Sequence, residues 1–183
     1  MKKFLLVAAA GLVTACSTHS GSYAPLPTQA NIDLNKYVGT WYEQALLPNS
    51  FQDQCVSNVR AEYVLNDDKS ITVTNSCQLK DGKTDVAVGQ GRLAQDVEPQ
   101  DPAKLEIRFA PAALSWVPAV WGDYWILKTQ GDYEYSLVGT RDRQYLWVLS
   151  REKNADTAVV QELLNYAGTL GYAVDKVKLS KQN

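Results

Sequence analysis

Residues 55–77, CVSNVRAEYVLNDDKSITVTNSC, contain two alternating segments on either side of a polar turn. In the first segment, apolar residues occupy the odd positions of 59–65 and polar residues occupy the even positions of 58–62. Such a period of two is typical of a half-buried β-strand, and Asn-Asp-Asp at 66–68 favours a turn. The stretch therefore predicts an antiparallel β-hairpin with one buried face.

The turn at 66–68 also predicts a pairing register for this hairpin. It places Ala61 opposite Ile71, so that two apolar residues face each other, and it places Cys55 opposite Cys77. Opposite Cβ atoms in an antiparallel pair lie about 4.5–5.5 Å apart, which a disulfide can bridge with small adjustment. We expect a Cys55–Cys77 disulfide, with two free buried thiols as the alternative.

The rest of the chain continues as short strands separated by turn signals. With the two strands of the hairpin, the total is eight strands, which is typical of an antiparallel sandwich or barrel. The other six predicted strands are Gly39–Ala45, 84–95, Lys104–Phe109, Asp123–Thr129, Tyr133–Thr140 and Gln144–Arg151.

One helix is predicted after these strands. Asn154 and Asp156 are candidate N-caps, and Gly171 is a candidate C-terminal stop. Because the helix has a single apolar stripe, we expect it to pack on the outside of the sheet. The stripe consists of Val160, Leu163, Leu164, Ala167 and Leu170. A last short strand, Ala173–Leu179, is expected at an edge.

The N-terminus has the pattern of an export signal. Two lysines precede the ten-residue apolar run Phe4–Val13, which is about half the length of a membrane-spanning helix. Val13-Thr14-Ala15-Cys16 resembles the bacterial lipobox, which implies cleavage after residue 15 and lipid on Cys16. An ordinary signal peptide with an incidental cysteine is the alternative.

Residues 16–32 are rich in Ser, Gly and Pro, so we expect a flexible tether followed by one domain over 33–183. The whole chain has 18 basic and 20 acidic residues. Without its two N-terminal lysines it carries a net charge of −4, which argues against nucleic-acid binding. The composition neither predicts nor excludes a homodimer.

Catalytic chemistry finds little support in the residues available. The only histidine, His19, lies in the tether, which argues against Ser-His-Asp and Cys-His catalysis and against histidine-bound metals. Two of the three cysteines are expected in the disulfide. We therefore expect no catalytic residue, no metal and no cofactor, and we expect that the protein is not an enzyme.

Three motifs resemble those of lipocalins. Gly39-Thr40-Trp41 resembles the Gly-x-Trp signature of the first strand, and Gly131-Asp132-Tyr133 resembles the Thr-Asp-Tyr turn, with Gly131 in place of Thr. The segment Tyr145–Arg151 is similar to the motif of the eighth strand, which ends in Arg. The resemblance covers residues 34 to about 179. Within the family it points to the lipid-anchored bacterial branch, which also resembles apolipoprotein D.

The resemblance implies an all-β fold: an eight-stranded antiparallel up-and-down barrel with one C-terminal helix packed outside. Trp41 would then plug the closed end, with Arg151 over its ring. Such a barrel has room for one small ligand. Alternation nominates as wall residues Val59, Ala61, Tyr63, Ile71, Val73, Leu105, Ile107 and Phe109, for which plain core packing is the alternative.

The loop 110–122 has no charged residue and contains Trp116 and Trp121, which we add to the ligand-binding candidates. At a cavity mouth such a loop would meet a ligand, a bilayer or another protein, unless it folds back as a lid.

We expect a carrier of a fatty acid or lysophospholipid. A structural lipoprotein with a filled barrel and a docking loop is the alternative, and an enzyme acting on lipids is a third. Because Ser17 rather than Asp follows Cys16, we expect anchoring at the periplasmic face of the outer membrane.

Overall fold

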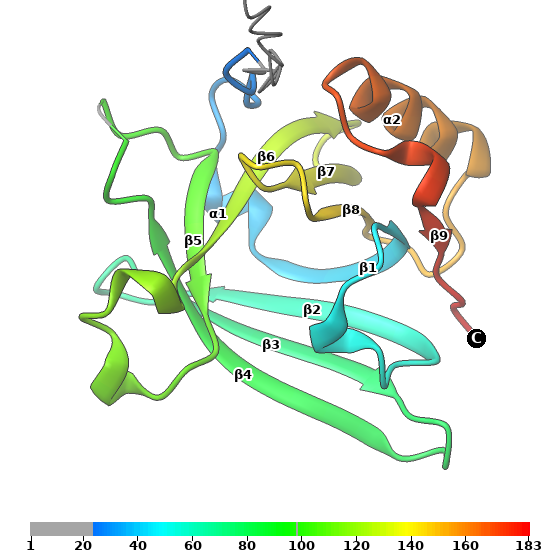
Figure 1. Cartoon of the computed structure of the whole chain (residues 1–183), viewed down its shortest axis with the longest axis horizontal. Coiled ribbons are helices and arrows are strands. Elements are labelled where there is room, and N and C mark those ends of the chain that lie inside the picture. The colour runs from blue at the N-terminus through cyan, green and yellow to red at the C-terminus, as the bar shows by residue number, and fades with distance from the viewer. Residues whose placement is uncertain (1–23, 98) are drawn as a thin grey trace, which may run out of the picture.

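The computed structural model describes residues 24–97 and 99–183 and has a closed antiparallel barrel with a helix outside (Figure 1). Each of β1 to β7 pairs with the next strand, and β1 also pairs with β8, which closes the barrel. The predicted up-and-down barrel is confirmed. The strands are β1 (Gly39–Leu46), β2 (Ser57–Leu65), β3 (Ile71–Gln78), β4 (Thr84–Leu93), β5 (Lys104–Arg108), β6 (Gly122–Gln130), β7 (Tyr135–Gly139) and β8 (Leu146–Ser150).

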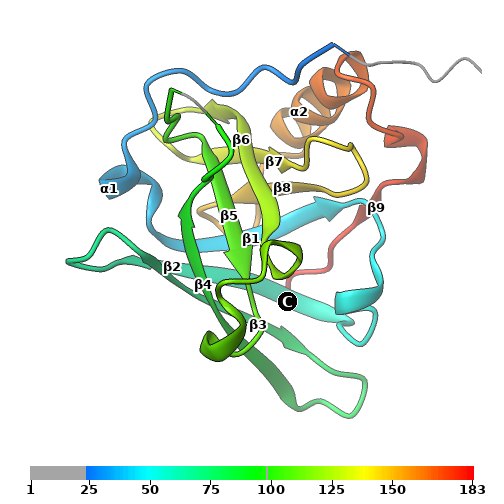
Figure 2. The same ribbon diagram turned by 60° about the vertical axis from the view of Figure 1, so that its left-hand side comes forward.

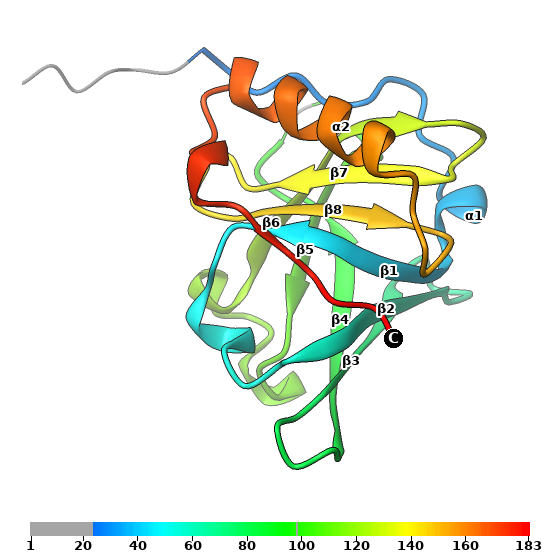
Figure 3. The ribbon, with the colours of Figure 1, turned by 90° about the vertical axis from the view of Figure 1, so that its right-hand side faces the viewer.

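The connections at the two ends of the barrel differ. At one end, the short helix α1 (Leu34–Tyr37) precedes β1, and its first turn is capped by Asp33, which accepts a hydrogen bond from the backbone N–H of Asn35. The β2–β3 and β6–β7 turns lie at this same end (Figure 3). At the other end the β1–β2 and β5–β6 loops contain three 3-10 helices, η1 (Ser50–Gln52), η2 (Ala112–Leu114) and η3 (Pro118–Val120).

A ninth strand, β9 (Lys178–Leu179), pairs with the end of β1. The first half of β1 pairs with β2 and the second half with β8, so β9 lies where β1 and β2 have separated. The prediction of a strand over Ala173–Leu179 was wrong for most of its length. Val174–Lys176 forms the 3-10 helix η4, whose local hydrogen bonds satisfy backbone groups without sheet pairing.

The helix α2 (Thr157–Thr169) covers the outer face of β7 and β8 (Figure 3). Of the two candidate caps, Asp156 is the one used, since its carboxylate accepts the N–H of Ala158 at 2.8 Å. The predicted apolar face is confirmed: Val160, Leu163, Leu164 and Ala167 are buried. Burial of each large side chain contributes about 1.5–3 kcal/mol.

Two apolar clusters share the strands β6 to β8. Alternate residues point to opposite faces of a strand, so Val138 belongs to the cluster inside the barrel and Leu137 to the cluster beneath α2. Both side chains are fully buried. The run of apolar residues in these strands follows from this burial on two faces.

The predicted register of the β2–β3 hairpin was wrong by four residues. Ala61 pairs with Asn75, and Ile71 pairs with Leu65. The turn is centred on Asp68, because Lys69 adopts the left-handed conformation at φ 66°. Asp68 also accepts hydrogen bonds from the N–H and hydroxyl of Ser70. A shift by an even number of residues keeps every side chain on its predicted face.

The Cys55–Cys77 disulfide is confirmed, with 5.5 Å between the two Cα atoms. Its geometry does not come from the direct pairing that the sequence suggested. Instead, an irregularity between Ser57 and Arg60 shifts the register, and Asn58 there has a φ of 53°. The backbone N–H of Val56 then bonds the carbonyl of Gln78, which brings Cys55 beside Cys77.

The described part of the expected tether, residues 24–32, lies along the barrel (Figure 2). Leu26 is only 6% exposed and packs in the cluster beneath α2, and Ile32 is buried at the closed end. The backbone N–H of Gln29 bonds the carbonyl of Ile126 at 2.9 Å. The expectation of a flexible tether was therefore wrong for 24–32, because two apolar side chains in this polar stretch find partners. Residues 16–23, including Cys16, lie outside the described residues.

Candidate ligand cavity

Trp41 fills the closed end of the barrel and is fully buried. Its indole N–H donates to the carbonyl of Tyr37 at 2.8 Å, so the polar edge of the ring is satisfied. The guanidinium carbon of Arg151 lies 3.8 Å from the ring centroid, a cation–π arrangement. These are the positions that the resemblance implied for the two residues.

Arg151 also ties the closed end together through hydrogen bonds. Its guanidinium donates to five backbone carbonyls, those of Lys36, Tyr37, Val38, Thr40 and Tyr133. Gly39 lies within this set at φ +98°, and a Cβ there would lie 3.3 Å from Arg151 Nη1. Both the backbone conformation and the close guanidinium explain the glycine of the Gly-x-Trp motif.

The turn Gly131-Asp132-Tyr133 joins β6 to β7 and fastens α1 to the barrel. The hydroxyl of Tyr133 accepts the N–H of Asp33 at 2.8 Å, and Asp132 forms a 3.0 Å ion pair with Lys36. Gly131 has a φ of +66°, in the left-handed region. This conformation accounts for glycine where the family motif has threonine.

Three tyrosines form a buried layer above Trp41. The Tyr37 hydroxyl lies 2.9 Å from both the Tyr124 hydroxyl and the Ser136 hydroxyl. Burial raises the pKa of Tyr37 to about 12. Tyr63 packs against Tyr124, with 5.7 Å between the ring centroids. Tyr63 and Tyr124 line the cavity, so this layer is its floor.

Above the floor lies a cavity of about 720 Å³, within the range of about 300–1,000 Å³ typical of small-molecule sites. Its mouth is formed by the β1–β2 loop through Phe51, by the β5–β6 loop through Val120 and by the β7–β8 loop through Asp142. The barrel is therefore closed at one end and hollow at the other.

Seven of the ten predicted ligand-binding residues line this cavity, namely Val59, Ala61, Tyr63, Val73, Ile107, Phe109 and Trp121. Ile71 and Leu105 do not line it, although they point inward as predicted. Both are buried in the closed-end cluster, where they pack beneath the floor. Trp116 does not line the cavity either, because its side chain is 79% exposed to solvent.

Trp121 borders the cavity at its mouth, but its ring packs against the outer face of the wall, which alternation could not predict. It stacks on the guanidinium of Arg92 at 3.7 Å, and its N–H donates to the carbonyl of Ser115. Arg92 pairs with Glu106 in the β4–β5 ladder, on the face opposite to the inward Ile107. Part of the loop 110–122 thus packs on its own barrel.

Glu43 also lines the cavity, although it was not among the predicted site residues. It is only 3% exposed, and its carboxylate accepts hydrogen bonds from Gln52 Nε2 and from the Ser180 hydroxyl. Burial raises its pKa, and the two hydrogen bonds oppose that shift. The signal was available, because Glu43 follows Trp41 by two positions and so shares its inward face.

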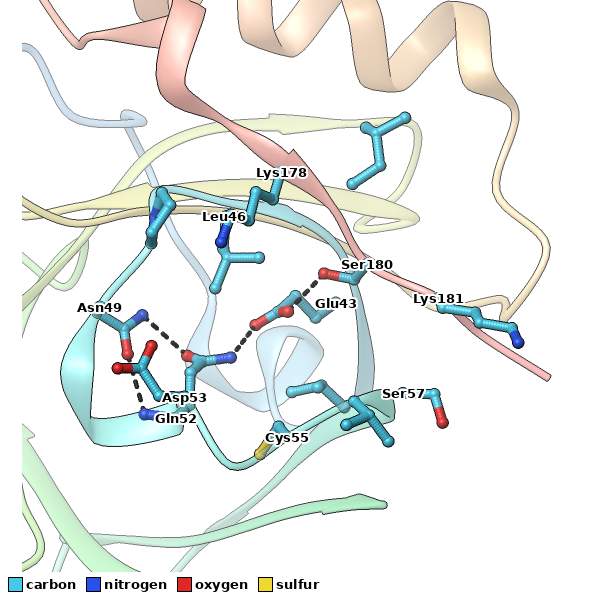
Figure 4. A pocket seen from close by; sticks show the side chains of 14 residues that line it. Glu43, Leu46, Asn49, Gln52, Asp53, Cys55, Ser57, Lys178, Ser180 and Lys181 are labelled. Carbon is cyan, nitrogen blue, oxygen red and sulfur yellow. Dashed lines mark hydrogen bonds between the residues drawn. The ribbon is translucent and has the colours of Figure 1, made fainter. Parts of the chain in front are cut away.

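A second, smaller pocket of about 200 Å³ lies beside the cavity, between β1, β2 and the C-terminal segment (Figure 4). Glu43 and Gln52 line both spaces and form part of the wall between them. On the outer side, Gln182 donates to the carbonyls of Glu43 and Val59, one from each strand. The C-terminal segment thus bridges the gap where β1 and β2 separate.

Within residues 24–97 and 99–183, no three His, Cys, Asp or Glu side chains gather closely enough to hold a metal ion. In the same part of the chain, no helix has the length and apolar character needed to span a bilayer.

The sequence matches the family model described as a lipocalin-like domain over residues 32–182. It is 35% identical to temperature-induced lipocalin-1 of Arabidopsis thaliana, over 83% of this chain and 80% of that protein. It is 31% identical to the outer membrane lipoprotein Blc of Citrobacter freundii, over 96% of this chain and 93% of that one. Apolipoprotein D of Macaca fascicularis is 30% identical, over 100% of this chain and 95% of that protein.

Solved structures agree on the fold. Insecticyanin from the tobacco hornworm Manduca sexta superposes with a TM-score of 0.67 at 24% identity, covering 88% of this chain and 86% of that one. Apocrustacyanin C2 gives a TM-score of 0.66 at 19% identity, covering 87% and 90%. The barrel, its motifs and these matches together establish that the chain belongs to the lipocalin family, whose members generally bind and transport small hydrophobic molecules.

Proposed function

We propose that this protein is a lipid-anchored lipocalin of the bacterial envelope that carries a single-chain lipid, a fatty acid or a lysophospholipid. The observation that carries the proposal is the cavity of about 720 Å³ with an apolar wall. Val73 of β3, Ile107 of β5 and Phe109 of the β5–β6 loop contribute to that wall. An acyl chain has the shape and polarity that such a wall accommodates.

The burial of an acyl chain supplies enough free energy for useful affinity. Ten CH₂ groups at about 0.8 kcal/mol each give about 8 kcal/mol, the value of a micromolar dissociation constant, before association costs. A longer chain or a satisfied head group would offset those costs. We therefore expect a dissociation constant in the micromolar range or below for a chain of about sixteen carbons.

Titration of delipidated protein with a fluorescent long-chain fatty acid and a fluorescent lysophospholipid tests this function. Saturable binding of one ligand per chain, displaced by the unlabelled lipid, is the expected result. Mass spectrometry of lipid that co-purifies with the native protein would identify the head group. If neither probe binds, the carrier function is wrong.

The proposed anchor is lipid on Cys16, as the lipobox resemblance implies. Support comes from the 31% identity to the outer membrane lipoprotein Blc, which extends over 96% of this chain. Cys16→Ala should release the protein from the membrane fraction into the soluble fraction. If the variant still sediments with membranes after a salt wash, the anchor lies elsewhere.

The alternative, a filled barrel that serves only for docking, is disfavoured by the size of the cavity. The docking loop that this alternative also requires is supported by the exposed side chain of Trp116. The ligand titration distinguishes the carrier from the docking module, because a docking module would bind no lipid in its barrel.

A further inference from the structure

The N-terminal segment leaves the barrel at the open end. The carbonyl of Ala24 accepts a hydrogen bond from Arg143 Nη2 at 2.7 Å. Arg143 belongs to the β7–β8 loop, in which the neighbouring Asp142 lines the cavity mouth. From Ala24 the chain runs along the barrel to Ile32 at the closed end (Figure 3). The segment that would carry the lipid anchor therefore begins beside the mouth.

Exposed apolar side chains concentrate at the same end. Among the described residues, nine large apolar side chains are exposed, and only Val64 lies within two residues of a closed-end turn. Trp116, at 79% exposure, is the most exposed of the nine. The others are Phe51, Val56, Val86, Val88, Phe109, Leu114 and Leu179. By contrast, Lys36 and Asp132 pair on the surface of the closed end.

The reach of the anchor distinguishes the two orientations. Ala24 lies eight positions after Cys16, and even fully extended this stretch spans at most about 28 Å. The ten-residue strand β4 is about 33 Å long, and a tilt of about 35–45° reduces its span from mouth to closed end to about 23–27 Å. With the closed end on the bilayer, Ala24 would lie near the limit of that reach. With the mouth on the bilayer, the anchor reaches without strain.

We propose that the mouth of the barrel rests on the surface of the bilayer that holds the anchor, with Leu114 and Trp116 in the interfacial layer. This orientation rests on the proposed lipid anchor. Trp is enriched at membrane interfaces, where its amphipathic ring is favourable. Because residues 110–121 carry no charge and the domain is mildly acidic, the surface suits zwitterionic rather than anionic lipid. A lipid would then pass between bilayer and cavity without crossing water.

Fluorescence quenching in vesicles tests the orientation. The full-length lipidated protein is reconstituted into phosphatidylcholine vesicles in which a fraction of the lipids carries bromine on the acyl chains. Bromine quenches only tryptophans that reach the bilayer. We expect quenching in the wild type and weaker quenching in Trp116→Phe, since Trp116, at 79% exposure, is the most exposed tryptophan of the mouth. The remaining tryptophans are common to both proteins, so their background cancels.

The matched control moves the probe to the opposite end. Val64→Trp in the Trp116→Phe background places a half-exposed tryptophan near the closed-end turn, and we expect no quenching there. Quenching at position 64 but not at 116 would overturn the orientation, and so would vesicle-bound protein without quenching at either position. Protein that does not float with the vesicles would refute the anchor itself, and with it the orientation. Cavity binding in solution would remain a separate result.

Discussion

The two ends of the barrel use the same inward faces of the same strands for opposite purposes. At the closed end, Trp41 is fully buried, its N–H is bonded, and Arg151 covers its ring. At the open end the inward residues border a cavity, and Phe109 is 47% exposed. The tightest packing is therefore at one end of the barrel and the cavity at the other. Such a division lets the mouth vary without loss of the fold.

A single strand displays this gradient. In β3 the successive inward residues are Ile71, Val73, Asn75 and Cys77. Ile71 packs beneath the cavity floor, whereas the other three line the cavity, where Cys77 forms the disulfide. The direction of a side chain follows from the period of two, but its function follows from its depth in the barrel.

The largest difference between the ends should come from their aromatic residues. Trp41→Ala removes a fully buried ring and should lower the free energy of unfolding by about 3–5 kcal/mol. Phe109→Ala is the matched control at the mouth and should lower it by less than about 1 kcal/mol, because the ring is half exposed. Urea denaturation measures both. Equal losses would show that the open end is as tightly packed as the closed end.

The disulfide tests whether the open end needs covalent support. The bridge closes a 22-residue separation, which stabilises by about 3 kcal/mol in the chain-entropy model. The double variant Cys55→Ala, Cys77→Ala should lower the free energy of unfolding by about that amount. Titration of the unfolded, unreduced wild-type domain should find neither thiol free. Loss of ligand affinity larger than the loss of stability would assign the bridge a direct part in the mouth.

Arg151→Ala should separate stability from binding. It removes hydrogen bonds to five carbonyls and the cation–π contact with Trp41. Because the guanidinium is only partly buried, we expect a loss of about 2 kcal/mol in the free energy of unfolding. Lipid affinity should stay within twofold of the wild type. An affinity loss without a stability loss would mean that the ligand reaches the closed end.

The sequence predicted side-chain direction better than position along the barrel. Alternation correctly predicted that Val73 and Ile107 point inward. It also predicted Ile71 and Leu105 as wall residues, because a period of two does not show how deep a residue lies in the barrel. The depth of a residue depends on the position of the turn in its hairpin. The β2–β3 turn was predicted at 66–68, but it is centred on Asp68, where Lys69 adopts the left-handed conformation.

Features that depend on partners distant along the chain were not predicted from the sequence. The position of the Trp121 ring depends on Arg92 from β4, a contact that no local pattern encodes. Residues 24–32 lie along the barrel because Leu26 meets the α2 cluster. Glu43 was not among the predicted cavity residues, although its spacing from Trp41 places it on the inward face. Charged residues are mostly exposed, and its burial depends on its partners Gln52 and Ser180.

Ile107→Glu tests the cavity wall directly. The new carboxylate would face an apolar ligand and lose hydration, so we expect at least a tenfold loss of affinity, about 1.4 kcal/mol. Ile107→Leu keeps the apolar volume and is the matched control, with affinity near the wild type. Unchanged affinity in a folded Ile107→Glu protein, as judged by denaturation, would place the ligand outside the barrel.

The smallest expected effect concerns the pH dependence of stability through Glu43. An unfolded glutamate has a pKa of about 4.3, and burial raises the pKa of the Glu43 carboxyl above that value. The folded protein therefore binds the proton more tightly, so its contribution to stability is full below about pH 4.3 and is lost as the pH rises through the folded pKa. Glu43→Gln removes this loss while keeping an amide that can bond Gln52 and Ser180. The free energy of unfolding of the variant relative to wild type should rise with pH, with a slope below about 1.4 kcal/mol per pH unit.

Glu62→Gln, at an exposed position of β2, is the matched control. Its free energy of unfolding relative to wild type should change less with pH than that of Glu43→Gln. A difference of the opposite sign would mean that the hydrogen bonds from Gln52 and Ser180 outweigh the burial of the charge at the inner edge of the open end.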